Sequence, residues 1–262
     1  MIGGARIAAA ADESLSIFFP AYCEEENVEY MLEEAALVAD SLTDRWELIV
    51  VDDGSTDRTA ELVSEASRRD SRVRLVRHSR NLGFGAALQS GISASRYGWV
   101  FYTDFDGQFD LTELSRLWRI RESADIVAGY RRRRRDPLMR LGYSLAYNSL
   151  VYTLFGGGFK DIDSSFKLYR RSIFRRVRPR STCGVIDLEI LLLARAWGYR
   201  IVQLPVTHRP RRAGTVSFES VRSGVVAWVR LGPISEMFGQ LVSLRRRLSS
   251  RRSMMESNGD LR

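Results

Sequence analysis

Hydrophobic and polar positions follow two different rhythms along the first half of the chain. Short runs rich in valine, isoleucine and aromatic residues predict strands, whereas longer stretches with apolar residues at helical spacing predict helices. The predicted strands are Leu15–Phe19, Trp46–Val51, Val73–Val76, Gly98–Thr103 and Ile126–Gly129. The predicted helices are Glu26–Leu42, Asp57–Arg69, Phe84–Ser95 and Leu111–Glu122. Because the two kinds of element alternate, the pattern predicts an α/β fold with a mainly parallel sheet flanked by helices.

The second half of the chain lacks this regular alternation. Two further strands are predicted at Ser165–Tyr169 and Ile201–Val206, with a strongly apolar helix at Ile186–Trp197 between them. The segment Leu141–Phe159 has 19 residues without a charge, close to the length that spans a bilayer. Its tyrosines, serines and three consecutive glycines make a membrane span a poor interpretation. A helix packed on the domain and a helix lying along a membrane surface both remain consistent with it.

Apolar residues recur at helical spacing again from Phe218 onward, on both sides of Pro233. One face is formed by Ile234, Met237, Phe238, Leu241 and Leu248, and arginines close the segment. The pattern predicts amphipathic helices over residues 219–250 that suit an anionic lipid surface, where each nearby basic residue adds about 1 kcal/mol. A solvated charged tail is the alternative interpretation.

Composition limits the class of protein. The chain has 262 residues, of which 45% are apolar and 27% charged, as expected of a globular protein with a sizeable core. Its two cysteines, Cys23 and Cys183, lie far apart and have no metal-type spacing, so neither a disulfide framework nor a zinc site is indicated. Residues 1–14 are too weakly apolar for a secretory signal. These features favour a reducing, cytoplasmic setting.

The net charge of +8 comes from arginine, because Lys160 and Lys167 are the only lysines among 40 basic residues. A genome rich in G and C accounts for part of this bias but not for its clustering, at Arg131–Arg135, at Arg209 to Arg212 and at Arg245–Arg252. Arginine binds phosphate as a planar fork. The clusters therefore indicate an anionic partner: nucleic acid, lipid headgroups or a phosphorylated substrate.

Two short acidic stretches lie where predicted strands end, at Val51–Ser55 and Asp104–Gln108. Asp104 and Asp106 are separated by one residue, so both can approach one hard divalent cation, which prefers oxygen ligands and tolerates a diphosphate in its shell. Carboxylates gathered at strand ends in this way indicate a site for a metal and a phosphorylated ligand. Nucleotide-sugar chemistry fits that combination.

Several motifs, in order and with matching spacing, resemble those of family 2 glycosyltransferases of the GT-A fold. These are Phe19–Asn27 (FPAYCEEEN), Val51–Asp57 (VDDGSTD), Asn81–Leu88 (NLGFGAAL) and Asp104–Gln108 (DFDGQ). Asp161–Lys167 (DIDSSFK) and the basic loop Arg211–Ser217 are similar to those of dolichol-phosphate mannose synthases and bacterial polyprenyl-phosphate glycosyltransferases. The resemblance covers about Ser16 to Phe218.

This resemblance implies a Rossmann-like GT-A domain over residues 15–218, followed by the amphipathic segment at 219–250. Residues 1–14 and 251–262 are expected to be flexible tails.

The resemblance also implies roles for individual residues. Those that correspond to nucleotide-binding positions are Pro20, Tyr22, Glu24, Val51, Asp53, Asp104, Phe105, Asp106, Gln108, Arg131 and Arg211. Asp104, Asp106 and Gln108 are the implied ligands of Mg²⁺ or Mn²⁺, with Asp106 the most direct, and Asp104, Asp106 and Arg131 the implied catalytic residues. Arg131 matches an arginine on the diphosphate or acceptor side, and Arg211 one that closes over the donor. Two departures weaken the match: Cys23 replaces the usual asparagine, and the loop after Gly214 lacks the lysine of some members.

The implied activity is inverting, metal-dependent transfer of a hexose from a nucleotide-sugar to polyprenyl or dolichyl phosphate. Mannose from GDP-mannose is the first expectation. The enzyme would lie peripherally on the inner, cytoplasmic face of the membrane, and nucleic acid is not an expected partner. The alternatives are UDP-glucose or another UDP-sugar as donor, a non-lipid acceptor, or a non-catalytic binding module on a degenerate GT-A fold.

The chemistry gives independent reasons for these residue types. Breaking a sugar–phosphate bond passes through a cation-like sugar and leaves negative charge on the diphosphate, which a metal and arginines stabilise. A lipid monophosphate ionises a second time near pH 6, as phosphate monoesters do, so its oxygen is already a nucleophile at pH 7. A strong general base is therefore optional.

Other polar residues keep two interpretations at this stage. Asp187 and Glu189 can be acceptor-side carboxylates or acids favoured by the start of a helix. Asp52 can bind ligand or hold the strand-to-helix turn. His78 and His208 are isolated, and His208 is expected to shape the basic loop. The stretch Gly83–Leu88 begins like a dinucleotide fingerprint but lacks its third glycine, which argues against a Rossmann dehydrogenase.

Overall fold

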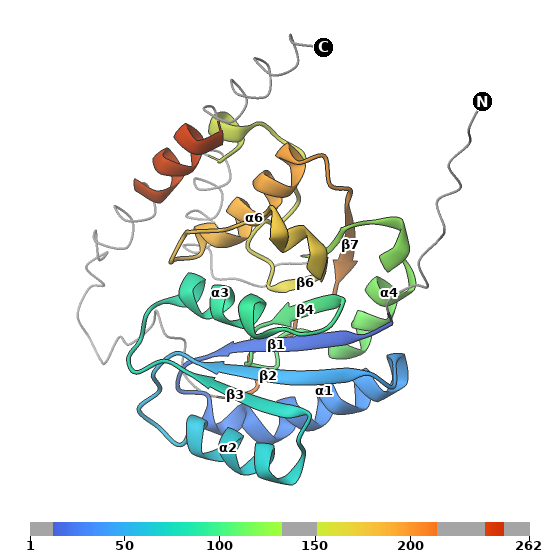
Figure 1. Ribbon diagram of the computed structural model, residues 1–262, viewed down its shortest axis with the longest axis vertical. Coiled ribbons are helices and arrows are strands. Elements are labelled where there is room, and N and C mark those ends of the chain that lie inside the picture. Colours follow the sequence, from blue (N-terminus) through green and yellow to red (C-terminus); the bar gives the residue numbers. More distant parts are fainter. Residues whose placement is uncertain (1–12, 133–150, 214–238, 249–262) are drawn as a thin grey trace.

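The computed structural model of the chain describes residues 13–132, 151–213 and 239–248. Within these residues the core is a seven-stranded sheet in the order β3-β2-β1-β4-β6-β5-β7 (Figure 1). The strands are β1 (Leu15–Ala21), β2 (Trp46–Asp52), β3 (Val73–Arg77), β4 (Trp99–Thr103), β5 (Ile126–Arg131), β6 (Phe166–Arg170) and β7 (Ile201–Val206). Neighbouring strands are parallel except where β6 pairs with β4 and β5. The predicted α/β class with a mainly parallel sheet is confirmed.

Helices cover both faces of the sheet (Figure 1). On one face lie α1 (Val28–Leu42), α2 (Thr59–Arg69) and α4 (Leu114–Arg119). On the other lie α3 (Phe84–Ala94), α6 (Val185–Ala196) and the helical residues 239–248. Short 3-10 turns connect the elements: η1 (Glu25–Asn27), η2 (Leu111–Glu113), η3 (Arg121–Ser123) and η4 (Arg171–Arg175).

The apolar runs predicted as strands are buried on both sides, as in parallel sheets that carry helices on both faces. In β1, Ile17 and Phe19 belong to the core beneath α1, whereas Phe18 points to the opposite core. Phe18 stacks on Tyr102 of β4 with ring centroids 5.5 Å apart. Because β1 contributes side chains to both hydrophobic cores, a shift of one residue in its pairing would exchange its two faces.

One predicted helix is shorter than expected. The stretch Leu111–Glu122 forms η2, α4 and η3 in place of a single helix. At its start, the Asp110 side chain accepts a hydrogen bond from the Thr112 amide and so begins a 3-10 turn. At its end, Arg121 donates to the Trp118 carbonyl at 2.9 Å, which satisfies a carbonyl that a continuing helix would use.

The uncharged segment Leu141–Phe159 is described only from Val151 onward, where residues 151–155 are helical. Val151 is buried and Leu154, Phe155 and Phe159 pack against the α3–α6 core, so this part contacts the protein. Tyr152, in contrast, is 68% exposed. No helix in the described part of the chain is long and apolar enough to cross a membrane.

The predicted amphipathic segment is described only at residues 239–248. There Leu241 and Leu244 are completely buried in the α3–α6 core. The apolar face of this stretch is thus used for packing on the protein. The rest of the predicted segment, both predicted tails apart from residues 13 and 14, and the arginines at 133–135 lie outside the described residues.

Candidate active site

The residues singled out by sequence come together at one edge of the sheet. Strands β1, β2, β4 and β5 run in the same direction, so their carboxyl ends and the loops that follow meet there. The antiparallel strand β6 begins at this edge, with Phe166 paired to Thr103 of β4. The loop before it, residues 161–165, therefore lies beside the acidic motif that follows β4. In open α/β sheets this edge is where ligands bind.

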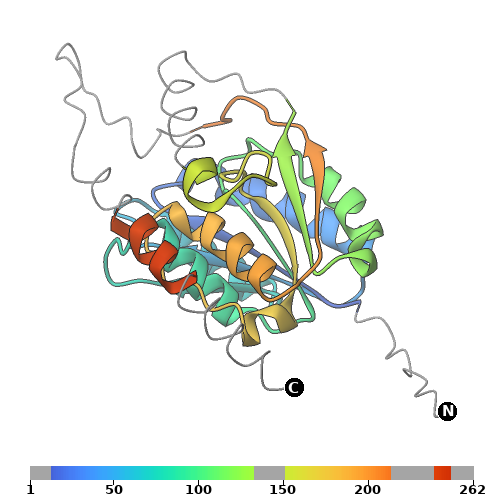
Figure 2. The same ribbon diagram turned by 90° about the horizontal axis from the view of Figure 1, so that it is seen from above.

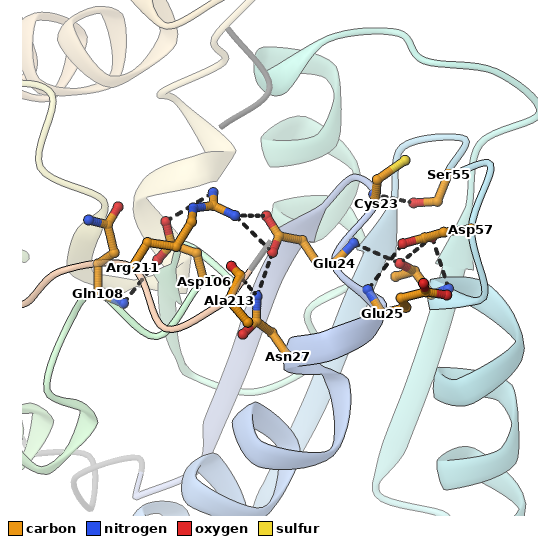
Figure 3. Close-up of polar contacts among 11 residues, drawn as sticks. Cys23, Glu24, Glu25, Asn27, Ser55, Asp57, Asp106, Gln108, Arg211 and Ala213 are labelled. Carbon is orange, nitrogen blue, oxygen red and sulfur yellow. Dashed lines mark hydrogen bonds and ion pairs between the residues drawn. The ribbon is translucent and has the colours of Figure 1, made fainter. Parts of the chain in front are cut away.

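Arg211 lies between two acidic residues that come from different loops (Figure 3). Its Nη1 donates to both carboxylate oxygens of Glu24, at 2.8 and 3.1 Å. Its Nη2 lies 3.3 Å from Oδ2 of Asp106. Both carboxylates are nearly buried, and Asn27 donates a third hydrogen bond to Glu24 at 2.7 Å. Three residues predicted at the donor site therefore form one ion-paired cluster.

Asp104 is the most strongly perturbed acid of this edge. Burial and the nearby charge of Asp106 raise the pKa of Asp104 to about 7, although a hydrogen bond with Ser165 acts in the opposite direction. Burial also raises the pKa of Glu24, against the attraction of Arg211. Burial is the larger cause of both shifts, and for Asp104 the negative charge of Asp106 adds to it. A divalent cation bound at this acid pair would favour the ionised form of both carboxylates.

The basic loop after β7 folds back over the acidic motif. Gln108 donates its side-chain amide to the Arg209 carbonyl at 3.2 Å, and the Arg209 amide returns a 2.7 Å bond to the Gln108 carbonyl. The guanidinium of Arg212 stacks 3.8 Å above the Tyr30 ring. His208 contacts Phe109 edge-on, with ring centroids 5.0 Å apart, so it shapes this loop as predicted. The loop thus brings Arg211 to the carboxyl edge.

Arg131 is held by a neighbouring acid. At the end of β5 its Nε and Nη2 donate to the two carboxylate oxygens of Asp161 at 2.7 and 2.6 Å, and its backbone amide adds a 2.9 Å bond. Asp161 adopts the left-handed conformation with φ 46°, which is uncommon outside glycine and asparagine. The first residue of the motif Asp161–Lys167 therefore orients the arginine that sequence assigned to the phosphates.

Four other residues predicted to contact the nucleotide fall into two groups, which differ in how deeply their side chains are buried. Pro20 and Tyr22, at the end of β1, are partly buried at the carboxyl edge. Val51 and Phe105 have side chains buried in the core, where Phe105 lies 5.1 Å from the Phe19 ring centroid. A nucleotide could reach these last two only through their backbone.

Asp53 and Asp52 organise the loops at the end of β2. Asp53 accepts hydrogen bonds from the Leu82 and Gly83 amides, both at 2.9 Å, and lies 2.6 Å from Nδ1 of His78. Asp52 accepts from the Ser55 amide at 3.0 Å, which confirms the turn-holding interpretation. Asp53 therefore fastens the start of α3 to the carboxyl edge.

A buried ion pair beneath the site was not predicted from sequence. Nζ of Lys167 lies 2.7 Å from a carboxylate oxygen of Asp187 and donates to the Ile162 carbonyl at 3.1 Å, with a further short contact to the Ser164 carbonyl. Tyr102 also donates to Asp187. The signal available in the sequence was a lysine immediately after a phenylalanine in an apolar strand.

Asp187 and Glu189 are not acceptor-side carboxylates. Asp187 is 2% exposed and paired with Lys167, and Glu189 is completely buried. The oxygens of Glu189 accept from the Arg180 and Ser181 amides and pair with Arg247. Both acids act as internal anchors, so neither of the two sequence interpretations describes them fully.

The donor set at this edge fits a magnesium or manganese ion in chemistry. Asp104 and Asp106 supply carboxylate oxygens, which such hard cations prefer. Among the described residues no group of three or more His, Cys, Asp or Glu side chains gathers closely enough to hold a metal. A cation bound by this acid pair would therefore take its remaining ligands from Gln108, from water or from a diphosphate.

Comparison with known proteins settles the family. The model of glycosyl transferase family 2 matches residues 16–178, which include the strands, loops and acids just described. The chain belongs to glycosyl transferase family 2. The family expected from the sequence motifs is thus confirmed.

The curated relatives include undecaprenyl-phosphate 4-deoxy-4-formamido-L-arabinose transferases of Salmonella. The proteins of Salmonella choleraesuis (strain SC-B67) and Salmonella newport (strain SL254) are each 31% identical over 216 residues. The matches cover 82% of this chain and 65% of each relative. The chain therefore spans somewhat less than two thirds of their length.

Solved structures confirm the GT-A fold. Glucosyl-3-phosphoglycerate synthase from Mycobacterium tuberculosis, crystallised with Mn²⁺ and UDP-glucose, has a TM-score of 0.63 at 20% identity and covers 91% of this chain and 79% of its own. A further mycobacterial protein has a TM-score of 0.56 at 23% identity, covering 76% and 68%. At these identities the likeness establishes the fold.

Proposed function

We propose that this protein transfers a sugar from a nucleotide-sugar to a polyprenyl phosphate, with inversion at the sugar carbon and with Mg²⁺ or Mn²⁺ bound at Asp104 and Asp106. One observation carries the proposal: this acid pair shares the carboxyl edge with Arg211 and, at the end of β5, Arg131. The lipid acceptor is supported by curated relatives named for transfer to undecaprenyl phosphate at 31% identity. The site is proposed to face the inner membrane surface.

In the proposed reaction an acceptor phosphate oxygen forms a bond to the sugar carbon as the bond from that carbon to the diphosphate breaks. The metal would stabilise negative charge on the departing diphosphate. Arg131 and Arg211 would bind phosphate oxygens, since guanidinium groups match them as a fork. No proton has to move when the acceptor is a dianion, so the chain's main task is to position two anions and reduce their repulsion.

The nature of the sugar is the finer part of the proposal. Mannose from GDP-mannose is the donor we test first, with UDP-glucose as the alternative. Purified protein is incubated with each donor, polyprenyl phosphate and Mn²⁺, and the lipid extract is analysed by mass spectrometry. A new lipid-linked sugar supports the proposal. Absence of product with these donors and other common nucleotide-sugars would remove the lipid acceptor from it.

Asp106→Asn tests the metal role separately. We expect it to abolish turnover and Mn²⁺-dependent nucleotide binding while the far-UV circular dichroism spectrum stays unchanged. Asp70→Asn is the matched control, because Asp70 pairs with Arg72 at the distant start of β3. Retained activity in Asp106→Asn contradicts the metal role. Nucleotide binding without any transfer, to lipid or soluble acceptors, would favour the rival binding module.

A further inference from the structure

The helical residues 239–248 are joined to α6 by an ion pair between the half-buried Arg247 and the buried Glu189. Arg247 Nη2 lies 2.6 Å from Oε1 of Glu189, whose side chain is completely buried. Leu241 and Leu244 of the same stretch are also fully buried. In both views this helix, drawn in red, lies beside α6 (Figures 1 and 2). The family 2 model ends at residue 178, so this contact lies beyond the matched region.

Glu189 connects this helix to the loop that precedes α6. Its other oxygen, Oε2, accepts from the Arg180 and Ser181 amides at 3.0 and 2.8 Å. Gln240 makes a second connection, because it accepts from the Thr182 amide at 3.2 Å and donates to the Thr182 hydroxyl at 2.9 Å. An apolar residue at position 189 could fill the same space but could not fix the loop and the helix to each other. We call Glu189, Arg247 and Gln240 the bracket.

The loop held by the bracket packs tightly on the start of α3. The Gly85 amide donates to the Thr182 carbonyl at 2.9 Å, and the Gln89 side chain donates to the Ser181 carbonyl at 3.0 Å. A Cβ at Gly85 would lie 2.4 Å from the Ser181 carbonyl oxygen, which is far too close. The backbone of the loop therefore determines where α3 begins.

The start of α3 is in turn bonded to the carboxyl edge of the sheet. The Leu82 and Gly83 amides both donate to Asp53, and the Asp53 amide donates to the Ala21 carbonyl at the end of β1. Gly83 has φ 95°, a conformation that favours glycine. A series of hydrogen bonds, linked by short stretches of backbone, thus runs from Gln240 to the edge where we place the nucleotide.

We propose that the bracket is a positioning device for the donor site: it holds residues 180–182 on α3 and thereby keeps the Leu82–Gly83 backbone bonded to Asp53. The donor half of this inference, namely that the bracket affects nucleotide binding, rests on the proposed function. Its structural half, the coupling of Arg247 to the backbone at residues 82–85, does not need a nucleotide to be tested.

The first measurement is amide hydrogen exchange of the ligand-free protein, followed by mass spectrometry. Arg247→Met removes the charge but keeps an apolar stem, so we expect faster exchange in the peptide containing Leu82 to Gly85 and unchanged exchange in α1. Arg247→Lys should restore much of the protection, since it keeps a cation. Arg245→Met is the matched control, because Arg245 is exposed on the same helix. If Arg247→Met protects residues 82–85 as well as wild type does, the proposal is wrong.

The second measurement is calorimetric binding of GDP and of UDP with Mn²⁺. We expect Arg247→Met to weaken binding at least about fivefold, the lower end of typical coupling between sites, and Arg245→Met to leave it unchanged. If Arg247→Met does not fold, Gln240→Ala replaces it, because it breaks the contacts of this side chain to Thr182 and Cys183 and leaves the Glu189–Arg247 ion pair in place. If wild type binds neither nucleotide, the proposed function fails and the exchange result alone decides the coupling. Binding by wild type and variant with equal affinity overturns the donor half.

Discussion

Arg211 lies between two acids at the carboxyl edge of the sheet. Its guanidinium neutralises Glu24 and Asp106, two nearly buried carboxylates from different loops. In the proposed reaction the same guanidinium binds phosphate, so donor binding requires an exchange of partners: metal for the acid, phosphate for the arginine. Such an exchange makes metal and diphosphate binding favour each other.

Arg211→Ala is the direct test of this exchange. Removal of the guanidinium leaves two nearly buried carboxylates without their cation, although Asn27 still donates to Glu24 and the Gln108 amide to Asp106. We expect this loss to cost about 1–3 kcal/mol of unfolding free energy. Because Mn²⁺ can then neutralise the acids without competition, we expect a lower melting temperature than wild type and a larger rise on adding Mn²⁺ alone. Thermal unfolding with and without Mn²⁺ measures both.

Arg212→Ala is its control, since Arg212 stacks on Tyr30 and pairs with neither acid in the described structure. Equal Mn²⁺-induced shifts in both variants and in wild type would show that Arg211 does not stand in for the cation.

The raised pKa of Asp104 predicts how the stability of the protein depends on pH. Burial raises the pKa of this group to about 7 from a usual value of 3.8, so the folded protein keeps a proton that the unfolded chain has already released. Between these two values the contribution of Asp104 to stability falls as pH rises, by at most about 1.4 kcal/mol per pH unit. Asp104→Asn removes this loss.

The measurement is urea unfolding in EDTA across pH 4.5 to 7.5 (roughly the window between the two pKa values). We expect the unfolding free energy of Asp104→Asn, minus that of wild type, to increase as pH rises. A constant difference between the two proteins across the window would mean that Asp104 ionises normally.

At the scale of elements, β6 is the part of the sheet that the site depends on most. It runs against its neighbours, so its amino end and the loop 161–165 lie where β4 ends. Lys167 holds that loop through the Ile162 and Ser164 carbonyls and is itself neutralised by Asp187 of α6. The loop in turn supplies Asp161 to Arg131 and Ser165 to Asp104.

The two lysines of the chain form a matched pair for testing this element. Lys167→Met leaves Asp187 buried without its cation, so we expect a loss of about 3–5 kcal/mol in unfolding free energy. Lys160→Met changes an exposed side chain near Tyr130 and should stay within about 0.5 kcal/mol of wild type. Chemical denaturation of both variants gives the comparison, and similar values for the two would contradict the role of Lys167.

The positions of the strands along the chain were predicted well from sequence. The strand Ile201–Val206 has the bounds that its apolar run predicts, and the other predicted strands differ from the observed ones by at most two residues at either end. Local periodicity is sufficient for this because both faces of the sheet are buried. The direction of β6 was not accessible, since the residues of a strand are the same in either orientation and only the partners decide it.

The ion pairs and hydrogen bonds within the candidate site were harder to predict from sequence, for a related reason. Motif resemblance placed Glu24, Asp106 and Arg211 at one site, but the ion pair of Glu24 and Arg211 joins residues 187 positions apart. Motif resemblance assigned Asp53 to the nucleotide but did not predict that its oxygens accept from the backbone at Leu82 and Gly83. Such contacts depend on how loops close over one another, which no local pattern encodes.

For the molecule as a whole, membrane attachment is still a prediction, and the structure changes its physical basis. The leucines at 241 and 244, on the expected lipid-facing segment, are buried in the protein. In the described part of the chain the attraction to a membrane would therefore come from arginine, in keeping with the net charge of +8. An attraction of this kind is electrostatic and is screened over about 8–10 Å at physiological salt.

We therefore expect this chain to bind vesicles that contain anionic lipid and to release them as salt rises, because each basic residue near the surface contributes about 1 kcal/mol only while it is unscreened. Flotation with anionic and neutral vesicles, at low and high sodium chloride, measures this. Duplex DNA under the same conditions is the comparison, since a general affinity for polyanions would retain both partners and lose both with salt. Equal binding to neutral vesicles would show that apolar insertion dominates. DNA binding as strong as that to anionic vesicles would show that the arginine clusters do not distinguish a membrane from nucleic acid.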